Sequence, residues 1–317
     1  MNHKHMKLVS ILVPCYNEEQ SLPIFYREIA CLMDGHPEYF WEVLFVNDGS
    51  SDSTLSIIKD LRQKDKRINY VNLSRNFGKE NAMLAGFDYV KGDCMVIMDA
   101  DLQDPPSIIP QMLEYWEQGY RDVYAKRTNR GKESWMRKKL SLMYYKTLNR
   151  FTDFKAQQNV GDFRLLDRQC INALCRLRES ERYTKGMFFW IGFDKKEILF
   201  NRSDRVAGDS KWSFWKLLNL AVDGITSFTT APLRLSILLG SVIAICAFAH
   251  ALYFVLKHLI LGDPVQGFTT LIATILLLGG LQLISIGILG EYIGRIFNET
   301  KRRPTYIASE YNEEIIQ

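Results

Sequence analysis

Short apolar runs alternate with amphipathic stretches over the first 126 residues of the chain. Short apolar runs are typical of buried strands, and apolar positions that recur at three- and four-residue steps are typical of helices. Strands are expected at 8–13, 43–47, 69–73, 94–98 and 122–126, and helices at 21–33, 53–65, 79–90 and 107–118. This alternation predicts an α/β fold with a Rossmann-like parallel sheet, in which ligands bind at the carboxyl ends of the strands.

Two apolar segments of 22 residues each, Leu235–Leu256 and Phe268–Leu289, lie near the far end and carry no formal charge. A helix of that length extends about 33 Å, which is enough to cross a hydrocarbon layer of about 30 Å. The joining loop has one lysine, whereas lysines and arginines flank the pair on both outer sides. The positive-inside rule therefore predicts a transmembrane hairpin with both ends in the cytoplasm. Two core helices of a soluble domain are the alternative.

Between the α/β pattern and the apolar segments, residues 212–227 carry apolar side chains at helical spacing, two of them tryptophans. This pattern favours a helix in the bilayer interface, with an ordinary amphipathic core helix as the alternative. The expected organisation is a cytoplasmic domain at 1–210, an interfacial helix at 211–231, a two-helix transmembrane hairpin at 232–298 and a cytoplasmic tail at 299–317.

Net charge and cysteine usage limit the possible binding partners and the cellular compartment. The net charge of +4 is too small to argue for nucleic acid, although basic residues gather at 126–155 and 295–303. Such runs are either a solvated face or a binding surface for polyanions or anionic lipid. None of the six cysteines forms a C-x-x-C pair, so we expect reduced thiols in a cytosolic domain.

Polar motifs follow four of the predicted strands, at Pro14–Glu18, Asn47–Thr54, Ser74–Lys79 and Asp99–Pro106. Because parallel strands end at one edge of the sheet, these motifs are expected to meet in one crevice. The chain contains neither G-x-G-x-x-G nor G-x-x-x-x-G-K-[ST], which argues against a dinucleotide dehydrogenase and a P-loop NTPase.

The fourth of these motifs contains Asp99, Asp101 and Gln103. In extended backbone Asp99 and Asp101 point to the same side. Hard oxygen ligands suit Mg²⁺ or Mn²⁺, either of which holds a substrate diphosphate. A strand followed by an ordinary polar turn is the alternative.

Taken together, the motifs resemble glycosyltransferase family 2, which has the GT-A fold. The residues that carry the resemblance are VPCYNEE at 13–19, VNDGSSDST at 46–54, LSRNFGKENAMLAGF at 73–87, DADLQDPP at 99–106, VGDFRLLDR at 160–168 and AGDSKW at 207–212. The two apolar segments, GEYIGRIF at 290–297 and KRRPTY at 301–306 narrow it to the polyprenyl-phosphate glycosyltransferases, relatives of dolichyl-phosphate mannose synthase. The chain looks most like the bactoprenol glucosyltransferases of phage-type O-antigen modification.

The resemblance implies roles for individual residues. Pro14, Tyr16, Asn17 and Glu18 would line a uridine pocket, Asp48 would hold the base or ribose, and Lys79, Asp99 and Lys211 would contact the nucleotide-sugar. Asp101 and Gln103 would bind the metal. Asp99, Asp101 and Asp162 would form the catalytic group, with Asp162 acting as a base or orienting Arg164 or the sugar.

The implied reaction is inverting transfer from a UDP-sugar to undecaprenyl phosphate, giving a lipid-linked sugar for cell-envelope modification at the bacterial cytoplasmic membrane. An acceptor phosphate needs cationic partners, and guanidinium groups bind phosphate bidentately. We expect this role for Arg127, Arg130, Arg137 and Arg205. The alternative for each of these arginines, taken singly, is a solvated surface residue that binds no ligand.

Several alternatives remain open. The resemblance favours glucose as the sugar, with N-acetylglucosamine or a 4-amino-4-deoxy-arabinose derivative as the alternatives. A processive polysaccharide synthase would carry a Q-x-x-R-W motif and more spans, which this sequence lacks. A non-catalytic membrane scaffold is disfavoured by the intact Asp99, Asp101 and Gln103. Small residues in the spans favour a homo-oligomer, and a flippase would act on the product.

Overall fold

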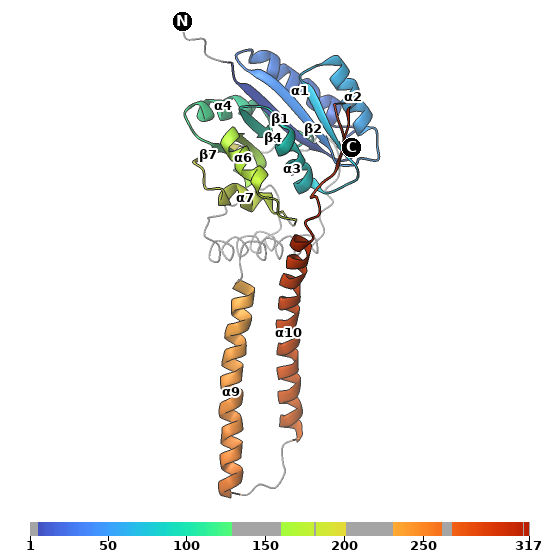
Figure 1. The fold of residues 1–317 in the computed structure, drawn as a ribbon. Coiled ribbons are helices and arrows are strands. Elements are labelled where there is room, and N and C mark those ends of the chain that lie inside the picture. The colour runs from blue at the N-terminus through green and yellow to red at the C-terminus, as the bar shows by residue number, and fades with distance from the viewer. Residues whose placement is uncertain are drawn as a thin grey trace. The chain divides into compact units, whose positions relative to one another are not determined.

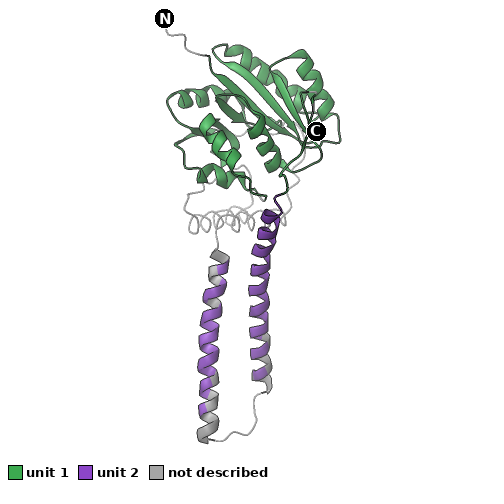
Figure 2. Ribbon diagram, in the orientation of Figure 1, with its two compact units in different colours: residues 1–221, 303–317 green, residues 222–302 purple. Residues whose placement is uncertain are grey.

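The computed structural model describes residues 6–128, 160–180, 182–200, 231–261, 268–312 and 314–316. The chain divides into two compact units, one comprising residues 1–221 and 303–317 and the other residues 222–302 (Figure 2). The interfacial helix expected at 211–231 lies outside the described residues, so that expectation stays a prediction.

A mixed sheet forms the centre of the first unit, with nine strands among the described residues in the order β7-β5-β6-β4-β1-β2-β3-β8-β9. The strands are β1 (Leu8–Cys15), β2 (Phe40–Asn47), β3 (Ile68–Leu73), β4 (Cys94–Ile97), β5 (Asp122–Arg127), β6 (Val160–Asp167), β7 (Lys195–Phe200), β8 (Ala308–Tyr311) and β9 (Glu314–Ile315). The expected α/β fold is confirmed, with β4, β1, β2 and β3 in parallel. The sheet as a whole is mixed, because β6 runs antiparallel between β4 and β5.

Helices cover both faces of this sheet (Figure 1). They are α1 (Leu22–Gly35), α2 (Thr54–Lys64), α3 (Lys79–Tyr89), the 3₁₀ turn η1 (Pro106–Ile108), α4 (Ile109–Glu117), α6 (Arg168–Arg176) and α7 (Thr184–Trp190). Alternation along β1 sends Val9, Ile11 and Val13 into the core that α1 and α4 cover. Leu12 faces α3, where Gly86 permits contact: a Cβ there would lie 2.2 Å from Leu12 Cδ1.

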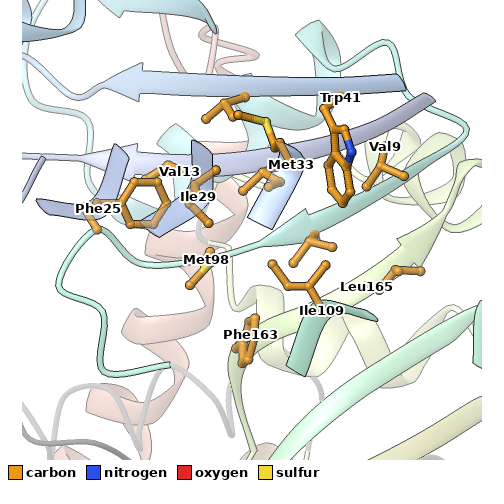
Figure 3. Packing of buried hydrophobic residues seen from close by; sticks show 14 of the residues in the cluster. Val9, Val13, Phe25, Ile29, Met33, Trp41, Met98, Ile109, Phe163 and Leu165 are labelled. Carbon is orange, nitrogen blue, oxygen red and sulfur yellow. The ribbon is translucent and has the colours of Figure 1, made fainter. Parts of the chain in front are cut away.

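The core reaches to the carboxyl edge of the sheet and positions the site there. Figure 3 shows Phe25 and Ile29 of α1 packed near Val13 of β1. Met98 and Phe163, each 1% exposed, belong to the same core. They are the sequence neighbours of Asp99 and Asp162, so core packing fixes where these two carboxylates leave the sheet.

The second unit contains α9 (Ala231–Leu261) and α10 (Phe268–Thr300), which contact each other. Among the described residues, one helical stretch is long and apolar enough to cross a membrane, the 24 residues Leu277–Thr300 with mean hydropathy 1.4. A shorter apolar stretch, Ser236–His250, lies in α9. The described residues thus contain one candidate span, and the expected pair of spans is not confirmed.

Residues after α10 return to the sheet. The sequence predicts a tail at 299–317 without a strand, yet β8 pairs antiparallel with β3 and β9 pairs with β8. The sheet thus incorporates residues that lie more than 230 positions after β3 in the sequence.

Candidate active site

The parallel strand order reverses between β1 and β4, since β2 and β3 lie on one side of β1 and β4 on the other. In open α/β sheets ligands bind outside the carboxyl ends of the strands at such a switch point. The motifs after β1, β2, β3 and β4 all follow this edge, and they contact one another as described below.

Asn17 joins the loop after β1 to the loop after β2. Its backbone is left-handed, with φ of 57°. Its Oδ1 accepts the backbone N–H of Ser51 at 2.9 Å, and its own N–H donates to Ser50 Oγ at 3.0 Å. The next residue, Glu18, donates its backbone N–H to Thr54 Oγ1 at 2.8 Å. Asn17 and Glu18 therefore hold the two loops together.

Two other residues of the expected uridine pocket lie in the same loop. Tyr16 is 48% exposed, so its ring is open to a stacking partner. Pro14, the penultimate residue of β1, is half-buried and pairs in register with Val46 of β2.

Asp48 is engaged by the backbone of the loop after β3. The residue is 3% exposed, and its two oxygens accept the N–H groups of Phe77 at 2.7 Å and Gly78 at 3.0 Å. Burial raises the pKa of Asp48, and these two hydrogen bonds oppose the rise. Next to it, Gly49 has φ of 63°, and a Cβ there would lie 2.4 Å from the Arg75 carbonyl carbon. This geometry gives Asp48 a positioning task, and the expected contact with base or ribose stays a prediction.

Lys79, the first residue of α3, bridges two carboxylates. Its Nζ lies 2.6 Å from Asp99 Oδ1 and 2.9 Å from Asp162 Oδ2. Burial alone would lower the pKa of Lys79, but the charges of Asp162 and Asp99 outweigh it and raise that pKa. For Asp162, burial favours a higher pKa, while the charges of Lys79 and Lys185 pull it well below its usual range. Asp162 is thus an anion at neutral pH and a weak proton acceptor.

The chain turns sharply within the acidic motif. Leu102 is left-handed, with φ of 54°, and Asp101 Oδ1 accepts the backbone N–H of Gln103 at 3.2 Å. Gln103 is 8% exposed and Asp104 4%, whereas Asp101 is only half-buried. This turn leaves the Asp101 carboxylate accessible to a ligand.

No group of three or more His, Cys, Asp and Glu side chains among the described residues is arranged to hold a metal by itself. Mg²⁺ and similar ions are commonly bound through one or two carboxylates, with substrate phosphates and water completing the shell. The half-buried Asp99 and Asp101 carboxylates fit this second arrangement.

Arg127 ends β5 beside the acidic motif. Its Nη2 lies 3.7 Å from Asp104 Oδ1, and a Cβ on Gly161 would lie 3.3 Å from the same nitrogen. The buried Arg127 Nε has no hydrogen-bond partner among the described residues. The other expected cationic residues, Arg130, Arg137, Arg205 and Lys211, lie outside the described residues.

Arg164 has a different partner from the one we considered. It is fully buried, its Nη1 lies 3.1 Å from Asp122 Oδ2, and its guanidinium carbon lies 3.8 Å from the centre of the Phe188 ring. Asp122 therefore orients Arg164, whereas Asp162 pairs with Lys79. The sequence signal was an arginine within the apolar run Phe163–Leu166, which requires a buried counter-charge.

Sequence reasoning also missed Glu80 and Thr184. Glu80 Oε2 accepts the backbone N–H of Thr184 at 3.0 Å and so fixes the start of α7 next to Lys79. Burial and the nearby charge of Asp162 raise the pKa of Glu80. The motif around Glu80 carried no sign of this contact, because Thr184 lies 104 residues further along the chain.

Two family models and several curated relatives match this chain. The model of the family described as "Glycosyl transferase family 2" matches residues 10–175, and the one described as "GtrB C-terminal hairpin" matches residues 231–296. An uncharacterized glycosyltransferase of Synechocystis sp. is 45% identical over 303 residues, covering 95% of each chain. The bactoprenol glucosyl transferase of Shigella phage SfV is 42% identical, covering 94% of this chain and 97% of the relative.

Solved structures are more distant. Glucosyl-3-phosphoglycerate synthase from Mycobacterium tuberculosis, in complex with Mn²⁺, uridine-diphosphate and phosphoglyceric acid, is 16% identical with a TM-score of 0.46. The match covers 68% of this chain and 75% of that one.

Proposed function

The chain belongs to glycosyl transferase family 2 and has a GtrB-type C-terminal hairpin; on that premise we propose that it transfers glucose from UDP-glucose to a polyprenyl phosphate, with inversion at the anomeric carbon. It is a glycosyltransferase, as are its relatives over nearly the whole chain. The observation that carries the proposal is the Asp99–Lys79–Asp162 cluster beside Asp101, at the switch point of a chain 42% identical to bactoprenol glucosyl transferases.

In this proposal the loops after β1 and β2 receive the nucleotide. Tyr16 offers an exposed ring for stacking on the base, and Asn17 and Glu18 hold the loop that presents it. Asp48 keeps the loop after β3 in place through Phe77 and Gly78. Lys211 is proposed to contact the nucleotide-sugar, on the resemblance alone.

Asp101, with Asp99 and Gln103 next to it, would hold Mg²⁺ or Mn²⁺, which when bound neutralises the leaving diphosphate. The remaining tasks, orienting the carboxylates and offsetting charge on the sugar, fall to residues of the chain. Lys79 restrains Asp99 by an ion pair of 2.6 Å, so that this carboxylate keeps a fixed orientation toward the donor. Asp162, held on the other side of Lys79, adds negative charge where positive charge develops on the sugar ring.

The chemical step needs no strong base. The acceptor phosphate is already an anion at neutral pH, so one of its oxygens attacks the anomeric carbon, a C–O bond forms, and the bond to the UDP oxygen breaks. The lowered pKa of Asp162 accords with an electrostatic task rather than proton removal. Arg127 would bind the acceptor phosphate, with Arg130, Arg137 and Arg205 in the same role on sequence grounds alone.

We further propose that both apolar segments cross the bacterial cytoplasmic membrane, that residues 1–210 and 299–317 are cytoplasmic, and that the helix at 211–231 lies in the interface. The support is the length of the candidate span Leu277–Thr300 and the matched hairpin family at 231–296. A homo-oligomer and a flippase partner belong to this proposal. Reporter fusions near Gly262 and at Gln317 should map to opposite sides of the membrane, and a shared side would refute the hairpin.

The deciding experiment is a donor panel against undecaprenyl phosphate with mass spectrometry of the product. The expected product is glucosyl-phosphoryl-undecaprenol, formed with release of UDP. Transfer of N-acetylglucosamine or an aminoarabinose derivative instead would retain the reaction and replace the sugar. No UDP release with any donor would support the non-catalytic scaffold.

A further inference from the structure

The chain that follows α10 returns to the first unit as a segment of seven residues, Tyr306–Asn312, here called the return segment. Its strand β8 pairs with β3, and Ile307 O accepts the backbone N–H of Ser74 at 2.9 Å. Ser74 is the first residue of the loop after β3, whose amides at Phe77 and Gly78 bind Asp48. The return segment therefore holds the start of a loop that the proposed donor site uses.

A second connection runs from the return segment to the loop after β2 through side chains. Ser309 Oγ accepts from Asn72 Nδ2 at 3.2 Å and donates to Asn72 O at 3.0 Å. Asn72 Oδ1 in turn accepts from Asn47 Nδ2 at 2.7 Å. Asn47 is 1% exposed and immediately precedes Asp48.

The same series of contacts continues to the loop after β1. Asn47 Oδ1 accepts the backbone N–H of Ser50 at 3.4 Å, and Ser50 Oγ accepts the backbone N–H of Asn17 at 3.0 Å. Hydrogen bonds thus link Ser309, Asn72, Asn47, Ser50 and Asn17 in this order across three strand ends. Each link is between neutral groups, whose hydrogen bonds are short-ranged and directional.

The return segment also has anchors that do not lead to these loops. Tyr306 OH donates to Asp88 Oδ2 at 2.6 Å, on the last turns of α3. Glu310 accepts from Tyr70 OH at 2.6 Å and pairs with Lys59 at 2.8 Å, within the sheet and α2. These contacts hold the segment in place, so the link through Ser309 and Asn72 is not required merely to dock it.

We propose that Ser309 of the return segment and Asn72 of β3 are positioning residues of the donor site, which set the loops after β1, β2 and β3 for the nucleotide. This inference rests on the proposed function, because it takes those loops to be the nucleotide-binding ones. It concerns the affinity for the nucleotide and leaves the binding of the lipid acceptor unaffected.

The test uses the full-length enzyme in lipid nanodiscs with Mn²⁺ and compares Ser309→Ala with the matched variant Tyr306→Phe. Ser309→Ala should raise the KM for UDP-glucose about five-fold, the equivalent of one hydrogen bond, and leave the KM for undecaprenyl phosphate unchanged. Tyr306→Phe removes one anchoring hydrogen bond and should lower Tm without changing either KM. Ser309→Thr keeps the hydroxyl and should restore the donor KM.

Hydrogen–deuterium exchange of the peptides that cover 47–54 and 74–79 gives a readout that needs no turnover. Exchange there should be faster in Ser309→Ala than in the wild type or Tyr306→Phe. Equal exchange in all variants, or equal donor KM for Ser309→Ala and Tyr306→Phe, overturns the inference and leaves the segment a structural edge strand. Failure of the wild type to transfer glucose refutes the proposed function instead, and the exchange rates still decide the positioning role.

Discussion

At the β1–β3 end of the sheet edge, hydrogen bonds and close backbone contacts hold the loops together, whereas at the β4–β6 end oppositely charged side chains pair with one another. Asn17, Asn47 and Asp48 make the first end a fixed frame. Lys79, Asp99 and Asp162 make the second an ion cluster, in which one ammonium lies 2.6 Å from Asp99 and 2.9 Å from Asp162. The contrast suits a site that binds a nucleotide at the rigid β1–β3 end and stabilises the charges of the transfer step at the charged β4–β6 end.

The largest effect should come from the charged end. Asp101→Asn keeps the size of the side chain and removes the anionic oxygen offered to the metal, so transfer should fall by at least about a hundred-fold. Steady-state turnover with added Mn²⁺, alongside the Tm of the variant, measures this. Wild-type turnover that persists in EDTA would remove the metal from the proposal.

A smaller effect should follow from breaking the rigid end. Gly49→Ala places a Cβ 2.4 Å from the Arg75 backbone at a position with φ of 63°, so we expect a loss of about 2–4 kcal/mol of stability together with weaker UDP binding. Gly78→Ala is the matched control, because its φ is 91° but no atom of the residues that the structure describes lies within 4 Å of the added Cβ. It should cost about 1–3 kcal/mol of backbone strain, because φ of 91° with ψ of 154° is a conformation adopted almost exclusively by glycine. Chemical denaturation of both variants distinguishes a clash from strain, and equal losses would contradict the close approach of the two loops.

The acceptor side of the charged end is probed by Arg127→Ala. Losing one charge-assisted contact should raise the KM for undecaprenyl phosphate about ten- to a hundred-fold, or about 1.5–3 kcal/mol, and change the KM for UDP-glucose little. Arg127→Lys should recover part of the affinity, because an ammonium lacks the bidentate fork. A rise in the donor KM alone would move Arg127 to the donor site.

The smallest effect concerns stability and pH. The lowered pKa of Asp162 and the raised pKa of Lys79 mean that their pair stabilises the fold above about pH 4, the unfolded-state pKa of an aspartate, and below the pKa of an unfolded lysine near about 10. Lys79→Met should therefore cost about 1–2 kcal/mol at neutral pH, between the values for exposed and buried pairs. The Tm difference from the wild type should shrink as the pH falls below about 4. A difference that is constant down to pH 3 would contradict the pairing.

The sequence predicted the parallel half of the sheet well, because the strands and helices there are local patterns. β1 to β5 and α1 to α4 lie within a few residues of the expected ranges. It also predicted that the polar motifs meet at one edge, which follows from parallel pairing. The partners within the site were not predictable, because Lys79 and Asp162, or Glu80 and Thr184, are joined only by the fold.

The sequence did not predict which strands the later parts of the chain add to the sheet. β6 lies between β4 and β5, and β8 beside β3, although each follows its neighbours by long stretches of sequence. The return segment carries no apolar alternation strong enough to indicate a strand. It pairs because the edge of β3 would otherwise leave backbone N–H and C=O groups without partners. The ion pair of Arg164 was not predictable for a related reason, because its partner Asp122 comes from another strand.

The position of β8 also bears on how the protein is made. Its strand is synthesised after α9 and α10, so the sheet edge at β3 stays open until both apolar helices have left the ribosome. The loops after β1, β2 and β3 therefore reach their final arrangement only after the hairpin has been synthesised. In the proposed topology, the order of the elements along the chain would tie completion of the sheet to insertion of the hairpin, and a nascent chain without α10 lacks the strand that completes the sheet.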